Sequence, residues 1–192
     1  HALQQTEIAI DVEIVVTGYE DPTAGLRGGS VHAGIIGGPT DIDHELDHIL
    51  LGSDPRVAIV AERYGMAKAR GATLAEIDEI GWLDVPKGDG LWHRYWRGDL
   101  DRGGAPNKIN RSCGNFQELQ YGLMSGDGIC TIPQSMVRLL VLEGVEFVPV
   151  TDLDPAPVRL AHRRDSPSNS ALQQLSEPLC QIAAQELLTV ST

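Results

Sequence analysis

Apolar and polar residues alternate near the start of the chain, a pattern that predicts a β-strand. The segment IAIDVEIVVTG spans residues 8–18, with Asp11 and Glu13 on its polar face. We therefore expect a strand with one buried face, which the apolar Val15 extends partly to the other face. The residues of the apolar face are Ile8, Ile10, Val12, Ile14 and Val16.

The next two segments predict a helix and a second strand. Residues 21–29 can form a short helix, because Asp21 can cap it, Pro22 suits its first position and Gly28 and Gly29 can end it. VHAGIIGGP, at 31–39, is a short apolar run closed by Gly and Pro, which indicates a buried strand. Strand, helix and strand at this spacing indicate a βαβ unit, so we expect a parallel sheet.

The middle of the chain alternates short strands with short helices. Helices are clearest in TLAEIDEI, where Thr73 can act as a cap, and in NFQELQYGLMSGDG, which we expect to end at Gly126. Other helices are expected at 90–104 and 134–140, and strands or extended segments at 56–62, 106–112, 129–133, 145–150 and 157–164.

The most strongly patterned helix is the last one, within residues 166–188. Ser166 can cap this helix and Pro167 falls in its first turn. Pro178 interrupts it, so we expect a kink or a split into two helices. Its apolar face comprises Leu172, Leu175, Leu179, Ile182 and Leu187.

Composition then narrows the class of protein. The chain has 192 residues, 42% of them hydrophobic, and a net charge of −12. This length suits one domain or two small lobes around a cleft, and no apolar run is long enough to span a membrane. An acidic surface repels phosphate backbones, so we do not expect this chain alone to bind DNA. Three cysteines without a C-x-x-C pair favour a cytoplasmic location.

The order of several loose motifs resembles the effector-binding domain of LysR-type transcriptional regulators. GSVHAGII, at 29–36, stands where that family has a G-x-(L/V)-D-x-A-(I/L) strand, although His32 replaces the usual Asp. ERYGMAKARGATLAEI, at 62–77, is similar to its HPLA stretch and the following helix. GDGICTIP, at 126–133, is similar to its G-x-G-I-x-x-L-P stretch. The resemblance covers nearly the whole chain.

The resemblance implies a two-lobed α/β fold like that of type II periplasmic binding proteins, with mixed sheets and helices on both faces. Lobe I is expected to take residues 1–54 plus 152–192, and lobe II residues 55–151. The winged helix-turn-helix of such regulators is expected to be absent from this chain. The first strand and first helix of the effector domain are also expected to be missing.

A short histidine motif raises a different possibility. HELDH, at 44–48, matches the H-E-x-x-H zinc-protease signature, which needs a helix so that His44 and His48 can bind one Zn²⁺. The resemblance instead implies a strand at 45–51, in which the two histidines would lie about 13 Å apart. We therefore expect two solvent-facing histidines and no metal site.

The resemblance also implies an effector site in a cleft between the lobes. Backbone N–H groups at Phe116 and Gln117 are expected to favour a carboxylate. Trp92 lies in an aromatic stripe with Tyr95 and Trp96, which either stacks on a ligand or packs against its own sheet. The expected site residues are Thr17, Gly18, Tyr19, Gly37, Gly38, Pro39, Pro86, Trp92, Asn115 and Phe116.

The expected function is therefore to sense a small molecule. The effector is expected to be a small organic acid or aromatic metabolite, most simply an anion, that modulates DNA binding by a winged helix-turn-helix. The resemblance implies a homodimer or tetramer, with no catalysis and no cofactor. The alternative is a type II solute-binding or dehydratase-like domain of the same fold.

Overall fold

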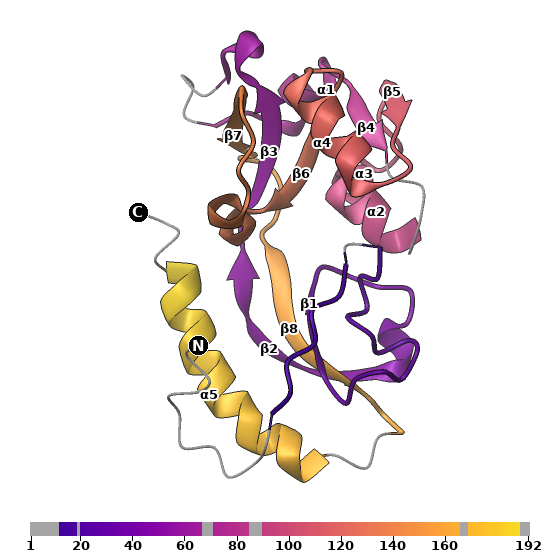
Figure 1. Cartoon of the computed structure of the whole chain (residues 1–192), viewed down its shortest axis with the longest axis vertical. Coiled ribbons are helices and arrows are strands. Elements are labelled where there is room, and N and C mark those ends of the chain that lie inside the picture. The colour runs from indigo at the N-terminus through magenta and orange to yellow at the C-terminus, as the bar shows by residue number, and fades with distance from the viewer. Residues whose placement is uncertain (1–11, 19, 67–70, 85–89, 166–168, 189–192) are drawn as a thin grey trace. The chain divides into compact units, whose positions relative to one another are not determined.

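The computed structural model describes residues 12–18, 20–66, 71–84, 90–165 and 169–188 (Figure 1). The chain divides into two compact units. The first unit contains residues 1–53 and 157–192, and the second contains residues 54–156. The chain enters the second unit directly from strand to strand, because β2 (Leu46–Asp54) is followed at once by β3 (Arg56–Ala61). Strand β8 (Ala156–Arg163) leads it back.

The first unit is built on a sheet with the strand order β1-β8-β2, where β1 is Gly34–Gly37. Strand β1 runs antiparallel to β8, with Ile36 opposite Arg159. A short 3₁₀ helix, η2 (Asp43–Glu45), precedes β2. One apolar cluster contains Leu26, Ile36, Ile42, Leu46 and Ala161.

Helix α5 (Asn169–Leu188) belongs to the same unit and is shown in yellow in Figure 1. It contributes to a second apolar cluster in which Leu179 packs with Leu51 of β2 and Leu160 of β8. Leu175 and Ala183 lie against this cluster. Two residues of the expected apolar face, Leu175 and Leu179, therefore pack on the sheet, and a third, Leu172, is buried.

The second unit is centred on β3, all of whose residues are buried. Within the described residues its main sheet has the order β6-β3-β7, and both partners are antiparallel to β3. A smaller sheet pairs β4 with β5 in parallel. The bounds are Trp82–Asp84 for β4, Ile109–Ser112 for β5, Cys130–Pro133 for β6 and Val145–Pro149 for β7.

Helices surround these sheets, and two of them begin at residues that the sequence identified. Helix α1 (Leu74–Asp78) starts with a capping box, in which Thr73 and Glu76 bond reciprocally. Helix α4 (Phe116–Met124) starts at Asn115, whose side chain accepts the N–H of Glu118. The remaining helices are α2 (Gly90–Trp96), α3 (Asp99–Arg102) and the 3₁₀ helices η3 (Glu62–Tyr64) and η5 (Gln134–Leu139).

The expected first strand is not present in its described part. Residues 12–18 have no regular structure, and Val16 is 90% exposed. Residues 8–11 lie outside the described residues. Alternation gives a segment two distinct faces, but a strand forms only where another strand satisfies its backbone groups. Residues 12–18 form no hydrogen-bonded pair with another strand in the described part of the chain.

The expected helix at 21–29 is a series of turns instead. The Asp21 carboxylate accepts hydrogen bonds as expected, from the N–H groups of Thr23 and Gly25 and from the Thr23 hydroxyl, but these bonds stabilise turns and not a helix. Ala24 and Gly25 then take positive φ values of 51° and 85°, which an α-helix cannot contain. The βαβ prediction is wrong for this region, because residues 21–29 form no helix. The expected parallel pairing is also wrong for β1, which runs antiparallel to β8.

Three helix predictions also need correction. Residues 90–104 form two short helices, because Gly98 has a φ of 74° and breaks the spiral between α2 and α3. Residues 134–139 form a 3₁₀ helix. Helix α5 runs through Pro178 without being split, so that alternative is wrong, while the kink stays a prediction. Its packing on Leu51 and Leu160 compensates for the hydrogen bond that proline cannot donate.

The histidine motif does not form a helix. His44 lies in η2, and His48 lies in β2, which begins at Leu46. The strand prediction is confirmed, so the two histidines do not share a helical face. Within the described ranges, no group of three or more His, Cys, Asp or Glu side chains is placed to hold a metal ion. Nor does any helix in the described part of the chain have the length and apolar character needed to cross a membrane.

Candidate functional site

Three of the expected site residues lie at the end of β1 and in the turn that follows it: Gly37 is the last residue of the strand, and Gly38 and Pro39 come after it. Gly38 has a φ of 77°, a left-handed conformation that glycine adopts without steric cost. Its N–H donates to the carbonyl of Pro157 at 3.0 Å. Its carbonyl accepts a hydrogen bond from Nη2 of Arg159 at 2.5 Å. Both polar groups of Gly38 are therefore already bonded to residues of β8 within the first unit.

Arg159 also pairs with Asp43 of η2. Its Nη1 and Nη2 donate to the two carboxylate oxygens of Asp43 at 3.1 and 3.2 Å. The Arg159 side chain is only 8% exposed, so the arginine of this ion pair is almost completely buried. Its Nε is buried and has no hydrogen-bond partner among the described residues. A buried donor without an acceptor costs about 1–3 kcal/mol.

The pKa of Asp43 reflects this environment. Burial raises it, but hydrogen bonds from Arg159 and Thr40 and the positive charge of Arg159 together outweigh burial and hold the pKa below the ordinary value of 3.8. Asp43 is therefore a carboxylate at neutral pH. Thr40 donates its hydroxyl to Asp43 at 2.7 Å, which links the turn to η2 a second time.

Because the polar groups of Gly38 are hydrogen-bonded within the first unit, this turn can contact a ligand mainly through apolar groups. Pro39 has no N–H, and the carbonyl of the Gly38–Pro39 peptide is turned to Arg159. Gly38 is itself buried, so the half-buried Pro39 ring is the group with which this turn can meet a ligand. The sequence identified the glycines but not Arg159, which lies more than a hundred residues away in β8.

Two further expected residues lie outside regular secondary structure. Thr17 is half-buried and Gly18 is exposed, and both lie in the irregular segment 12–18. The carbonyl of Gly18 accepts the N–H of Asp21 at 3.1 Å, so Gly18 starts the turns that follow. Tyr19 and Pro86 lie outside the described residues.

At the start of α4, Asn115 has a structural task. Its Oδ1 accepts the Glu118 N–H at 2.9 Å, and its Nδ2 donates to Glu118 Oε1 at 3.1 Å. The other Glu118 oxygen accepts the Gly114 N–H at 2.9 Å. A carboxylate of the chain therefore already lies at this helix start, where a bound anion was expected. Phe116, 41% exposed, follows directly.

Trp92 lies on α2 and is half-buried. Its ring meets His93 edge-on at 5.3 Å and Trp96 at 6.0 Å between ring centroids. Trp96 is the buried member of the stripe. The stripe therefore packs inward through Trp96, while Trp92 keeps part of its ring accessible.

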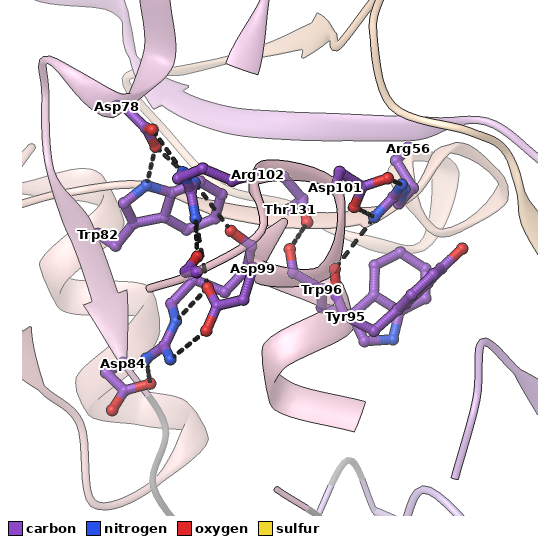
Figure 2. A network of polar contacts seen from close by, with 12 residues as sticks. Arg56, Asp78, Trp82, Asp84, Tyr95, Trp96, Asp99, Asp101, Arg102 and Thr131 are labelled. Carbon is purple, nitrogen blue, oxygen red and sulfur yellow. Dashed lines mark hydrogen bonds and ion pairs between the residues drawn. The ribbon is translucent and has the colours of Figure 1, made fainter. Parts of the chain in front are cut away.

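The sequence did not identify a polar network that holds α2 and α3 in place (Figure 2). Asp99, only 2% exposed, accepts two hydrogen bonds from Arg97, at 2.9 and 2.7 Å. Arg97 also pairs with Asp84 at 2.8 Å. The hydrogen bonds to Asp99, reinforced by the two negative charges, hold the pKa of Arg97 above its ordinary value despite partial burial.

The network continues to α1. Arg102 pairs with Asp78 through two hydrogen bonds of 2.7 Å and with Asp99 at 3.3 Å. Asp78 also accepts the indole N–H of Trp82 at 2.6 Å, and Figure 2 shows Arg102 beside the Trp82 ring. These bonds join α1 and β4 to α3. The Arg97–Asp84 pair in addition links β4 to the residue that directly follows α2, the helix that carries Trp92.

Apart from Thr17 and Gly18, the structure groups the described members of the expected site in three places. Gly37, Gly38 and Pro39 are consecutive residues at the end of β1 and in the turn after it. Asn115 and Phe116 share a helix start in the second unit, and Trp92 lies on α2 of that unit. In the sequence, RGDLDR at 97–102 signals a charged segment, but nothing in it identifies Asp78 and Asp84 as partners.

Comparison with known families gives this arrangement its context. The model described as LysR substrate binding domain matches residues 1–181. The chain therefore belongs to this family, whose domains bind the effectors of LysR-type transcriptional regulators. No curated protein matches the chain.

Solved structures show the same fold, of the periplasmic-binding-protein type. The effector-binding domain of BenM with its effector benzoate has a TM-score of 0.64 and 23% identity, over 85% of this chain and 74% of that chain. The reduced regulatory domain of OxyR2 from Vibrio vulnificus has a TM-score of 0.63 and 18% identity, over 83% and 76%. Full-length BenM has a TM-score of 0.64 and 24% identity, over 85% of this chain and 55% of that chain.

Proposed function

We propose that this domain binds a small organic anion and thereby regulates a transcription factor. The observation that carries the proposal is the family match over residues 1–181. BenM, which shares the fold, binds benzoate in its effector-binding domain. On this proposal the lobes are residues 1–54 with 152–192, and 55–151, close to the two compact units.

The proposed contacts are shared among the three groups of residues. The Gly37–Pro39 turn would offer apolar contact, because both polar groups of Gly38 are bonded internally. The accessible part of Trp92 would stack on an aromatic ring. Thr17, Gly18, Tyr19, Pro86, Asn115 and Phe116 complete the proposed site. This distribution favours an aromatic acid over a purely aliphatic one.

A thermal-shift titration tests the proposal. Benzoate, hydroxybenzoates and short aliphatic acids would be compared with neutral benzamide at matched ionic strength. An effector present at 100 times its Kd stabilises a protein by about 2.7 kcal/mol, which is easily measured. Aromatic carboxylates should stabilise the domain and benzamide should not. Equal responses to acid and amide, or no response to any acid in the panel, would contradict the proposal.

The variant to combine with this titration is Asn115→Ser instead of Asn115→Ala. Serine retains helix capping, whereas alanine would lower stability by about 1 kcal/mol and obscure a ligand effect. Trp92→Leu is the second variant, because it removes the stacking surface and keeps an apolar side chain. Weaker binding in both variants, with little change in the unliganded melting temperature, is the expected result.

We further propose that DNA is bound through a winged helix-turn-helix of the intact regulator and that the domain itself catalyses no reaction. The net charge of −12 supports the first point, since an acidic chain opposes contact with phosphates. Residues 1–192 alone should not retard operator DNA in a gel. The regulator that carries the winged helix-turn-helix should do so, with an affinity that changes on adding effector.

A homodimer is proposed as the working assembly. Apolar side chains are exposed on both units, including Ile35 at 54%, Leu50 at 61% and Tyr121 at 68%. Exposed apolar groups of this size favour burial against a partner where they cluster. Sedimentation velocity at micromolar concentration should give a dimer, and a stable monomer would contradict this part of the proposal.

A further inference from the structure

We infer that Arg159 and Asp43 are positioning residues that set the Gly38 turn for effector binding. We call Gly38, Asp43 and Arg159 the turn clamp. The inference rests on the proposed function for its biological meaning, because it assigns a role to residues next to the proposed site. Its structural basis lies entirely within the first unit.

The guanidinium group connects three segments that are distant in sequence. It belongs to β8, it donates to both oxygens of Asp43 in η2, and it donates to the carbonyl of Gly38 after β1. A planar guanidinium can make these bonds at fixed angles, which an ammonium group cannot do. The bond to the Gly38 carbonyl determines how the Gly38–Pro39 peptide is turned. The Pro39 ring is therefore presented in one orientation.

The contacts of Arg159 carry a cost as well as a gain. The Arg159 side chain is 8% exposed and its Nε donor is buried without an acceptor among the described residues. An apolar side chain in β8 would avoid that cost. What an apolar side chain would lose is the control of the Gly38 carbonyl and its link to Asp43.

The same two elements offer a matched control. Glu45, two residues after Asp43 in η2, pairs with Arg163, four residues after Arg159 in β8, at 3.1 Å. The Glu45 and Arg163 side chains are 39% and 32% exposed, and among the described residues neither forms a hydrogen bond with Gly38. Glu45→Gln therefore removes an ion pair between η2 and β8 but leaves the turn clamp intact.

Hydrogen exchange resolved by NMR tests the inference without any ligand. The Gly38 amide donates to Pro157 at 3.0 Å and should be protected. Arg159→Met and Asp43→Asn should accelerate its exchange roughly tenfold relative to the amides of β1, the factor expected on losing a charge-assisted hydrogen bond. Glu45→Gln should leave this ratio unchanged. Arg159→Lys should keep the charge but not restore protection at Gly38.

Two results would overturn the inference. One is an unchanged ratio between Gly38 and β1 in Arg159→Met. The other is equal acceleration throughout β1 and Gly38, which would show that the clamp only stabilises the sheet. Because no effector is used, a failure of carboxylates to bind would count against the proposed function and not against the clamp.

Discussion

Arg56, at the start of β3, forms a bidentate ion pair with Asp101 of α3, with nitrogen–oxygen distances of 3.0 and 2.7 Å. The Arg56 side chain is completely buried, whereas that of Asp101 is 20% exposed. The guanidinium also lies over the Tyr95 ring at 4.4 Å and donates to the Tyr95 and Asp154 carbonyls. One buried cation therefore holds α2 and α3 against the central strand of the second unit.

Removing its partner should be costly. Asp101→Ala leaves a buried arginine without its carboxylate, so we expect a loss of about 3–5 kcal/mol in the free energy of unfolding. Asp127→Ala is the control, because Asp127 pairs with Arg111 where both side chains are more than 40% exposed. That pair should contribute less than about 1 kcal/mol. Urea denaturation of both variants gives the comparison, and equal losses would contradict it.

Asn115→Ala should destabilise the second unit through its helix and not through an effector. The side chain caps α4 by accepting the Glu118 N–H at 2.9 Å. Loss of such a cap costs about 1 kcal/mol, whereas Asn115→Ser and Asn115→Asp should be nearly neutral. Thermal unfolding without ligand checks this. A melting temperature unchanged in Asn115→Ala would show that the cap contributes nothing.

Asp43 should make stability depend on pH below neutrality. Its pKa is held below the ordinary 3.8 in the folded chain, so the carboxylate form is favoured by folding. The stabilisation is complete above the unfolded pKa, near pH 4, and is lost as the pH falls through the folded pKa. The difference in unfolding free energy between the protein and Asp43→Asn should be constant from about pH 5 to pH 7 and shrink toward pH 3.

A denaturation series over that range tests the prediction. The Asp165 carboxylate, whose pKa is also lowered, pairs with Arg163 at the surface, so Asp165→Asn should show a smaller change. A difference between Asp43→Asn and the unaltered protein that grows on acidification would have the wrong sign and would refute the assignment.

The cysteines of the second unit should be unreactive in the folded protein. Burial, with a smaller contribution from Cys113, raises the pKa of the Cys130 thiol to about 12. Cys113 is fully buried and its pKa is raised by burial as well. Since the thiolate is the nucleophile, iodoacetamide near pH 8 should leave both unmodified. Both should react after unfolding in guanidinium, which mass spectrometry of tryptic peptides would detect. Rapid labelling of Cys130 in the native state would be the contrary result.

The sequence by itself determined the elements whose signals are local. Thr73 with Glu76 and Asn115 each mark a helix start, because a cap bonds to amides within a few residues. The run RVAIVA is a buried strand, since nearly every side chain in it is apolar. The motif order also led to the correct family, because a family pattern sums many weak local preferences along the chain.

The tertiary structure alone decided which strands pair and which turns replace helices. Residues 12–18 alternate as a strand should, yet they form none, because pairing depends on a partner that alternation does not specify. Pro178 does not end its helix, since packing on Leu51 and Leu160 outweighs the local preference. The family resemblance led us to expect Gly38 at the site, but it did not point to Arg159. An ion pair or hydrogen bond between segments a hundred residues apart leaves no periodic signal, and only the fold brings its members together.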